Sequence, residues 1–189
     1  MDSLAKGGTN RVRIIAGRQR RRLLRFPDVP GLRPTPDRVR ETLFNWLGQD
    51  LAGRRCLDAF AGSGALGLEA ASRGAVRVLL LERDPRVLAA LRGNARELGL
   101  GGVEVLGVDA LAYLAGTGET FDVIFLDPPF GAGLLDQALP HARTRLRPGG
   151  RIYIESPRPP APEVLEPLGL RVLRQGKAGL SHFCLLELA

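Results

Sequence analysis

The stretch from Leu57 to Gly67 reads LDAFAGSGALG and places a glycine-rich loop directly after a short apolar run. Gly62, Gly64 and Gly67 form a GxGxxG pattern, in which glycines let the backbone turn sharply and let a ligand lie against it. Glu82 follows about 20 residues later, at the spacing of an acid that binds a ribose. The stretch therefore predicts a nucleotide-like ligand at the start of an α/β domain.

Downstream of this loop, short apolar runs alternate with helical stretches. Such alternation is typical of an α/β fold with a parallel sheet covered by helices on both faces. After the proline-rich residues 157–162, the segments LRVLRQG and SHFCLLEL are predicted to form two closing strands. The other predicted strands are 55–60, 77–82, 103–108, 121–127 and 150–156, and the predicted helices lie near 65–74, 85–99, 110–116 and 134–146.

The chain before residue 51 has a different pattern. Residues 11–26, RVRIIAGRQRRRLLRF, hold two runs with apolar residues around Gly17, which predicts a β-hairpin with arginines on its solvent side. After a proline-rich turn, residues 37–47 show helical spacing of apolar residues, with Asp37 as the expected N-cap. The residues at that spacing are Val39, Leu43, Trp46 and Leu47.

The positive charge of the chain is concentrated at its N-terminal end. The formal net charge is +7, and residues 1–55 hold 13 Lys or Arg against five acids, whereas residues 56–189 hold 14 against 15. Arginine matches phosphate oxygens and stacks on bases, so this segment is expected to bind nucleic acid. Because lysine is nearly absent, a general preference for arginine is the alternative explanation. Arg25, Arg38 and Arg40 belong to the same basic segment, and the predicted nucleic-acid contacts are Arg11, Arg13, Arg18, Arg20, Arg21, Arg22 and Arg33.

Composition argues against several other classes of protein. Hydrophobic residues make up 44% and charged residues 25%, as in soluble globular proteins. The sequence has no apolar run of about 18 residues, and the first ten residues lack the apolar core of a signal peptide. Cys56 and Cys184 are predicted to be buried free thiols. With only two histidines in the sequence, a zinc site or a Ser-His-Asp triad is not expected. The expected location is the cytoplasm.

Acidic residues stand at the ends of four consecutive predicted strands. In open α/β sheets, ligands bind outside the carboxyl ends of the strands. Carboxylates crowded there are unfavourable unless a cation or hydrogen-bond donors lie between them. We therefore expect a cationic ligand that carries an amine, ribose hydroxyls and a base amine. The four acids are Asp58, Glu82, Asp109 and Asp127.

The tetrapeptide Asp127-Pro128-Pro129-Phe130 follows the fourth of these strands. Its prolines fix the backbone, so the loop presents carbonyls and a carboxylate beside an aromatic ring. A planar group with an exocyclic amine fits this arrangement, because the ring can stack on Phe130 while Asp127 and the Pro128 carbonyl accept the amine hydrogens. These four residues are the predicted catalytic residues.

Taken together, FAGSGALG, Glu82, Asp109 and DPPF resemble the S-adenosylmethionine-dependent methyltransferases of Rossmann-like fold that modify exocyclic amines. The segments RIIAGRQRRRLL, GLRPTPDRVRETLFNWL and LDAFAGSGALGLEAASRGA narrow the resemblance to the bacterial 16S rRNA guanine-N2 methyltransferase family, RsmD. The similarity covers nearly the whole chain and is strongest from Gly31 to Phe130. The segment GRQRRRLL carries more arginine than the family pattern leads us to expect.

This resemblance implies a class I methyltransferase with a seven-stranded, mostly parallel sheet and a reversed last strand. It implies S-adenosylmethionine as methyl donor and one guanine of 16S rRNA as target, within an assembling small ribosomal subunit. We divide the chain into an N-terminal extension, residues 1–50, that contacts RNA, and a methyltransferase domain, residues 51–189. A monomer without a metal or a membrane contact is expected.

The resemblance also assigns roles to residues at the cofactor. Glu82 is expected on the ribose hydroxyls, Asp109 on the adenine amine, and Asp58 at the methionine end. Three residues are expected to close over that end on resemblance alone: Thr35, Arg38 and Asn45. The whole expected cofactor set is Asp58, Phe60, Ala61, Gly62, Gly64, Glu82, Arg83, Asp109, Ala110, Thr35, Arg38 and Asn45.

Alternatives remain open at this point. DPPF also suits methylation of adenine N6 in RNA or DNA, or of a glutamine side chain, since each presents a flat amine. GxGxxG alone also suits a nicotinamide-dependent dehydrogenase, although Asp58, just before the loop, would repel a pyrophosphate. A non-catalytic RNA-binding module is the third class. The identity of the target base rests on the resemblance.

Overall fold

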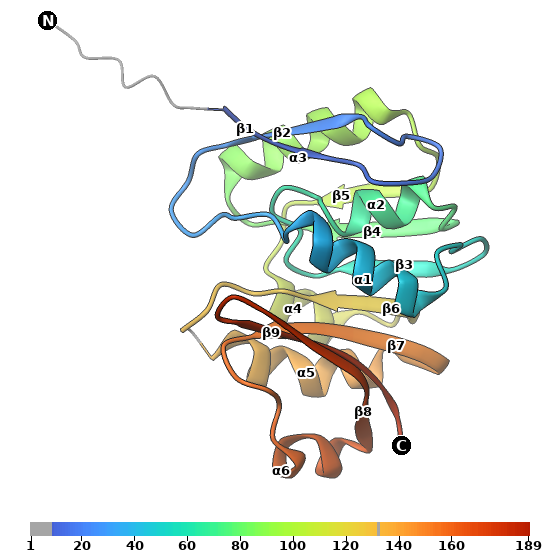
Figure 1. Cartoon of the computed structure of the whole chain (residues 1–189), viewed down its shortest axis with the longest axis vertical. Helices are drawn as coiled ribbons and strands as arrows, with labels where there is room; N and C mark the ends of the chain where they lie inside the picture. Colours follow the sequence, from blue (N-terminus) through green and yellow to red (C-terminus); the bar gives the residue numbers. More distant parts are fainter. Residues whose placement is uncertain (1–8, 132) are drawn as a thin grey trace, which may run out of the picture.

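The computed structural model describes residues 9–131 and 133–189. They form a large twisted sheet with helices on both faces and a separate two-stranded hairpin (Figure 1). The strand order of this sheet is β5-β4-β3-β6-β7-β9-β8. The strands from β3 to β7 run parallel, whereas β9, the last in the chain, is antiparallel to both of its neighbours. The predicted seven-stranded sheet with a reversed last strand is therefore confirmed. Its strands are β3 Arg55–Asp58, β4 Arg77–Leu81, β5 Val103–Leu106, β6 Phe121–Leu126, β7 Leu146–Ser156, β8 Leu170–Ala178 and β9 Ser181–Leu188.

The helices cover the sheet in two layers, each with its own hydrophobic core. Helices α1, α2 and α3 pack on one face through residues such as Leu43, Leu68 and Leu91, and α4 and α5 pack on the other through Leu114 and Leu139. Within the described residues, no helix is both long and apolar enough to cross a bilayer. The helices are α1 Asp37–Leu47, α2 Gly67–Ser72, α3 Pro85–Leu98, α4 Ala110–Gly116, α5 Leu134–Thr144 and α6 Pro162–Leu165, followed by a short 3-10 turn, η1 Glu166–Leu168.

The predicted elements are present, with differences at their ends. Helix α5 ends at Thr144, and β7 begins at Leu146, so the predicted helix was two residues too long. Helix α6 lies just after the proline-rich break and was not predicted, because four residues are too few to show helical periodicity. Cys56 and Cys184 are buried free thiols, as predicted. The expectation about a signal peptide falls mainly on residues 1–8, which lie outside the described residues.

The N-terminal hairpin consists of β1 Thr9–Arg13 and β2 Leu23–Pro27, which are antiparallel. Alternate residues point to opposite faces of a strand. The apolar set faces inward and is at most 7% exposed, while the arginines between them face solvent, as predicted. The buried set is Val12, Ile14, Leu24 and Phe26.

Two expectations about α1 were wrong. Asp37 is the first residue of the helix rather than its N-cap, which is Pro36, and the Asp37 carboxylate instead contacts Arg13 and Arg40. Arg40, which the sequence groups with the basic segment, is fully buried and pairs with the buried carboxylate of Glu69 at 3.5 Å. Arg40 is therefore part of the protein interior and is not available to nucleic acid.

Glu69, on α2, attaches the N-terminal hairpin to the rest of the protein. Its carboxylate accepts the backbone N–H groups of Ile15, at 2.7 Å, and Ala16, at 3.0 Å. It also contacts Arg40 and, at 2.8 Å, Arg73. Because buried charges are stable only when they are paired and hydrogen-bonded, this one side chain organises the contact between hairpin, α1 and α2.

Two further contacts hold the hairpin in place. The side chain of Asn94, on α3, accepts from the N–H of Arg25 at 3.1 Å and donates to its carbonyl at 2.8 Å. Gly17, with φ +80°, lies so close to α2 that a Cβ there would stand 1.9 Å from the carbonyl oxygen of Ser72. The hairpin and α1 therefore share a core with the sheet. The division after residue 50 stays a prediction.

Removing the Glu69 carboxylate is expected to destabilise the whole protein. In Glu69→Ala, Arg40 and Arg73 each lose a buried carboxylate partner, although Arg40 keeps its contact with Asp37. Breaking buried ion pairs in this way typically lowers the free energy of unfolding by about 3–5 kcal/mol. Glu97→Ala is the matched control, because it removes an exposed pair with Arg22 whose loss has an effect of about 0.5 kcal/mol or less. Urea unfolding of both variants measures the difference, and equal effects would contradict this account of Glu69.

Candidate active site

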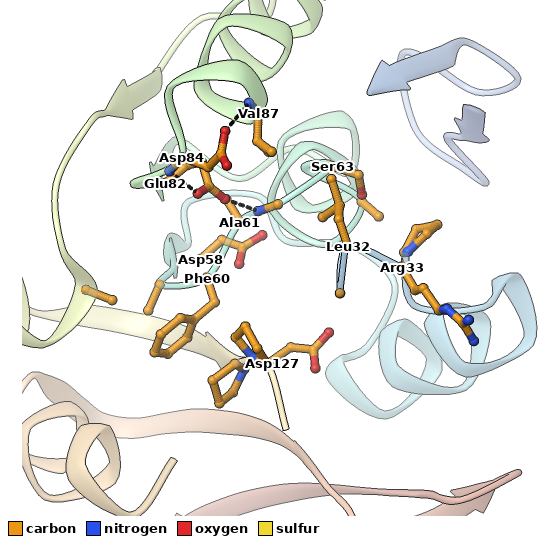
Figure 2. A pocket seen from close by; sticks show the side chains of 18 of the residues that line it. Leu32, Arg33, Asp58, Phe60, Ala61, Ser63, Glu82, Asp84, Val87 and Asp127 are labelled. Atoms are coloured by element: carbon orange, nitrogen blue, oxygen red, sulfur yellow. Dashed lines mark hydrogen bonds between the residues drawn. The ribbon is translucent and has the colours of Figure 1, made fainter. Parts of the chain in front are cut away.

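A cavity of about 610 Å³ opens at the carboxyl ends of the central strands. Its wall includes the glycine-rich loop, all four acids predicted at strand ends, and the whole DPPF tetrapeptide. The segment 29–36, which joins the hairpin to α1, forms the opposite wall. Figure 2 shows Glu82, Asp58 and Asp127 along one side, with Leu32 and Arg33 across from them. The structure thus brings these separate motifs together at one place.

The register of the sheet explains why the acids converge. Residues two apart on a strand point to the same face, and the face that carries Cys56, Leu80, Phe125 and Tyr153 packs against α1, α2 and α3. The acid two residues beyond each of these points the same way, at the edge of the sheet where helix packing ends. These acids are Asp58, Glu82, Asp127 and Glu155.

Asp58 ends β3 and is 1% exposed. Its Oδ2 accepts from the N–H of Gly67 at 2.9 Å, a close approach that a side chain at position 67 would block. Its Oδ1 is the one buried side-chain oxygen or nitrogen without a hydrogen-bond partner among the residues that the structure describes. Burial raises the pKa of Asp58 to about 7; the Gly67 hydrogen bond opposes this shift, and the charge of Glu82 adds to it. Such an oxygen calls for a donor from a ligand.

Glu82 follows β4 and holds the loops around it. Its Oε1 accepts the N–H groups of Arg83 and Asp84, both at 2.7 Å, and its Oε2 accepts that of Gly62 at 3.1 Å. The Asp84 side chain in turn caps α3 by accepting the backbone N–H groups of Arg86 and Val87 (Figure 2). Since each carboxylate oxygen can accept two hydrogens, Oε2 keeps one position for a ligand hydroxyl.

Asp109 lies farther along the same wall. Its Oδ1 accepts from Ala112 N–H at 3.0 Å and so caps α4, while its Oδ2 stands 3.8 Å from an Arg83 guanidinium nitrogen. The carboxylate is about half exposed, which leaves Oδ2 accessible from the cavity. Ala110, the next residue, also lines the cavity.

Asp127 follows β6 and faces the hydroxyl of Thr35. The Thr35 hydroxyl lies 3.4 Å from its Oδ2 and donates more closely, at 3.0 Å, to Glu155 at the end of β7. Burial raises the pKa of Asp127 well above its ordinary value, and the charges of Glu155 and Asp58 raise it further, whereas the Thr35 hydrogen bond lowers it. Asp127 is therefore well suited to receive a proton.

An aromatic ring stands at the mouth of the cavity beside Asp127. Phe130 is 51% exposed although it is a large apolar residue, and it lies next to the opening. Pro128 is buried, which fixes the loop against the protein. The side chain of Phe60 lies to the left of Asp127 in Figure 2 and lines the same space. A flat group entering the cavity would meet an aromatic face and the Asp127 carboxylate together.

Comparison with known proteins identifies the group to which this site belongs. The family model described as "Conserved hypothetical protein 95" matches residues 12–187. "Ribosomal RNA small subunit methyltransferase D" of Escherichia coli (strain K12) is 49% identical over 132 residues, which cover 70% of this chain and 67% of that protein. The chain belongs to the RsmD family. It is a methyltransferase of the Rossmann-like class I fold.

Solved structures agree with this membership. A putative methyltransferase of Escherichia coli has a TM-score of 0.81 and 41% identity, with 94% of this chain and 97% of that chain covered. The Thermus thermophilus 16S rRNA N2 G1207 methyltransferase (RsmC), solved with AdoMet and guanosine, has a TM-score of 0.72 and 26% identity. The match to RsmC covers 96% of this chain and 50% of that one.

Nine of the twelve residues in the expected cofactor set line the cavity of this RsmD-family chain. Arg38 and Asn45, both exposed on α1, and Gly64 are not among the described residues that line the cavity. Thr35 does line it, and its hydroxyl lies 3.0 Å from Glu155 and 3.4 Å from Asp127. No cluster of three or more His, Cys, Asp or Glu side chains suited to a metal ion occurs in the described part of the chain.

Glu155 and Ser181 line the cavity and were not predicted from the sequence. Glu155 could have been found, because GRIYIES is a fifth strand that ends in an acid, like the four that were noted. Ser181 begins β9 and reaches the cavity only because β9 is placed beside β7. No local pattern in the sequence indicates that neighbour relation.

The predicted RNA-contacting arginines are all exposed. Arg33 lines the cavity itself, while Arg11 and Arg13 border a second groove that reaches Thr35 and Pro36. Arg13 pairs with Asp37 at 2.9 Å, and Arg22 pairs loosely with Glu97 at 3.7 Å. Cationic side chains therefore run from the hairpin to the edge of the cavity.

Proposed function

We propose that this chain transfers a methyl group from S-adenosylmethionine to the exocyclic N2 of a guanine in 16S rRNA, in the cytoplasm, within an assembling small ribosomal subunit. The observation that carries the proposal is the pairing of two features in one cavity. One is the unpartnered buried Oδ1 of Asp58, and the other is the Asp127-Pro128 turn beside the half-exposed Phe130. The names of the family relatives and of RsmC support the rRNA and guanine parts.

The residues of the cavity fit the proposed methyl donor. The unpartnered Oδ1 of Asp58 suits an ammonium group, and the open position on Glu82 Oε2 suits a ribose hydroxyl. Gly62 lets the loop backbone face the cavity, since a Cβ there would lie 2.8 Å from the Leu32 side chain. The accessible Asp109 Oδ2 suits an adenine amine. When bound, S-adenosylmethionine supplies a methyl group attached to a positively charged sulfur. The sulfur becomes a neutral thioether when the methyl group is transferred.

The chain's own residues prepare the acceptor amine. A guanine N2 is a poor nucleophile because its lone pair is delocalised into the ring. Asp127 and the Pro128 carbonyl would each accept one amine hydrogen, which localises the lone pair and stabilises the positive charge that develops on nitrogen. Phe130 would hold the ring flat, so that the nitrogen is aligned for attack. After transfer the surplus proton on nitrogen passes to Asp127, whose raised pKa favours its uptake.

The proposal is tested by incubating the protein with a tritiated methyl donor and small subunits that lack their native methylations. Digestion and nucleoside analysis then report the modified base. N2-methylguanosine is expected. N6-methyladenosine would instead support the adenine alternative, and the absence of any incorporation would refute the proposed activity.

Neutralising two hairpin arginines is expected to weaken RNA binding. Arg18→Gln combined with Arg20→Gln removes two exposed cations. Each lost phosphate contact makes the slope of log K against log salt concentration less steep, and the double variant should change this slope by about 1.5. Arg171→Gln with Arg174→Gln is the control, because β8 lies at the opposite edge of the sheet (Figure 1). Filter binding at several salt concentrations measures the slopes. Equal slopes for the two double variants would show that Arg18 and Arg20 do not contact RNA and that the arginines reflect a general preference for this residue.

A further inference from the structure

Glu155 lies beside Asp127 in the cavity, and the proposed function gives it no role. Leu126 of β6 pairs with Ile154 of β7 in parallel register. Asp127 and Glu155 are the next residues on these two adjacent strands, so they leave the sheet at the same level. Neighbouring strands lie about 4.8 Å apart. Both residues line the cavity, and the Thr35 hydroxyl lies within 3.4 Å of both carboxylates.

The hydrogen bonds of Glu155 leave part of its carboxylate open. Three hydroxyls donate to it: Thr35 at 3.0 Å and Tyr153 at 2.8 Å to Oε1, and Ser181 at 3.2 Å to Oε2. No cation pairs with it within the described chain. A carboxylate has about four acceptor positions, so one remains on Oε2. Because Glu155 is 7% exposed and lines the cavity, only a group inside the cavity can use it.

The wall at this end of the cavity therefore offers acceptors and few donors. Asp127, the Pro128 carbonyl and Glu155 all accept, while the hydroxyls of Thr35 and Ser181 already direct their hydrogens to Glu155. A base that enters is recognised by its Watson–Crick edge. Guanine presents two adjacent donors there, the N2 amine and N1–H. Adenine presents its N6 amine next to N1, which is an acceptor.

We propose that Glu155 determines base specificity by accepting the N1–H of a guanine whose N2 amine is held by Asp127 and Pro128. This rests on the proposed function and adds a reason for the choice of base. An adenine with its amine at Asp127 would place the lone pair of N1 against a carboxylate. The site would then hold a buried acceptor facing another acceptor, a mismatch that enzymes use to reject a substrate strongly.

The test uses 2-aminopurine, which keeps the N2 amine but has an acceptor at N1. The target guanine in the RNA that supports methylation by wild type is replaced by 2-aminopurine, and single-turnover rates on both RNAs are compared. Wild type is expected to prefer guanine by about 10²-fold or more. RNA with 6-thioguanine, which keeps N1–H and loses O6, should react like guanine and shows that O6 is not the cause.

Glu155→Gln is expected to narrow or reverse this preference, because an amide can donate to the N1 of 2-aminopurine. Tyr153→Phe is the matched control, since it removes a hydroxyl from Glu155 but leaves the acceptor in place, and its preference should equal that of wild type. A wild-type enzyme equally fast on both bases, or Glu155→Gln with an unchanged ratio, overturns the proposal. So does a Tyr153→Phe variant that loses preference to the same extent. Absence of transfer by wild type to guanine would instead refute the proposed function.

Discussion

Asp127→Ala is expected to lower the rate of methyl transfer by about 10³-fold or more while cofactor binding stays within a few fold of wild type. The variant removes a carboxylate that would accept an amine hydrogen and take up the proton. It leaves Asp58, Glu82 and the glycine-rich loop unchanged, because Asp127 hydrogen-bonds none of them among the described residues. Single-turnover rates with saturating methyl donor, together with calorimetric titration of S-adenosylmethionine, measure the two effects separately.

Asp127→Asn provides a graded comparison. Its amide keeps one acceptor oxygen but cannot take a proton, so its rate should lie between those of wild type and Asp127→Ala. Folding is not expected to suffer, since removing Asp127 relieves repulsion from Glu155 and Asp58, whose charges act on its pKa. If Asp127→Ala also abolished cofactor binding, the assignment of Asp127 to the acceptor base would be wrong.

Asp58→Asn is expected to have the opposite profile, with a large loss of cofactor affinity. The Oδ1 of Asp58 is buried and unpartnered, and its carboxylate is the proposed partner of the ammonium group. Removing one member of a buried charge pair weakens binding by about 10²-fold or more. Calorimetry on the purified variant measures the loss. Unchanged affinity for S-adenosylmethionine would show that Asp58 does not hold the ligand.

Asp58→Asn is also expected to change how the free energy of unfolding depends on pH when no cofactor is bound. Burial raises the pKa of Asp58 in the folded protein from its ordinary value of 3.8 to about 7. An acid whose pKa is raised in the folded protein stabilises the fold at low pH, where the acid is protonated. This stabilisation is lost as the pH rises from about 4 through about 7, and the loss is on the order of 4 kcal/mol in total. Asp58→Asn cannot ionise, so its free energy of unfolding should change less between pH 4 and pH 8.

Urea unfolding of both proteins at pH 4, 6 and 8 tests this sign. Groups remote from Asp58 titrate equally in the two proteins, so the difference between them reports the ionisation of Asp58 together with its effect on the pKa of Asp127. The variant should be at least as stable as wild type at pH 8. A structural role for Asp58 predicts the reverse, namely a variant that is less stable and also binds the donor weakly.

Much of the fold could be predicted because its signals are local. Helix α1 was predicted to within one residue of its observed start and with its observed end, since its apolar residues repeat at helical spacing over residues 37–47. The acids at the strand ends were predicted to meet because parallel strands end at one edge of a sheet. That inference needs no knowledge of which strands are neighbours.

The parts that were missed depend on contacts between distant residues. Arg40 looks like one more solvent-exposed arginine, and only the fold brings it to Glu69, 29 positions further on. Arg40 also donates to the Thr35 carbonyl at 3.2 Å, which helps to hold Thr35 beside Asp127 and Glu155. Buried ion pairs of this kind have no periodic signature, because burial is decided by the partner.

The close contact between Gly17 and Ser72 limits how such an enzyme could be retargeted to another RNA. Exchanging the arginine-rich loop for a foreign one would have to keep a glycine at position 17, since any Cβ there collides with a backbone oxygen. The foreign loop would also have to place backbone N–H groups where Glu69, Ser72 and Asn94 of the recipient accept them. Substrate choice in this scaffold is therefore better altered by changing individual outward-facing side chains than by grafting whole segments.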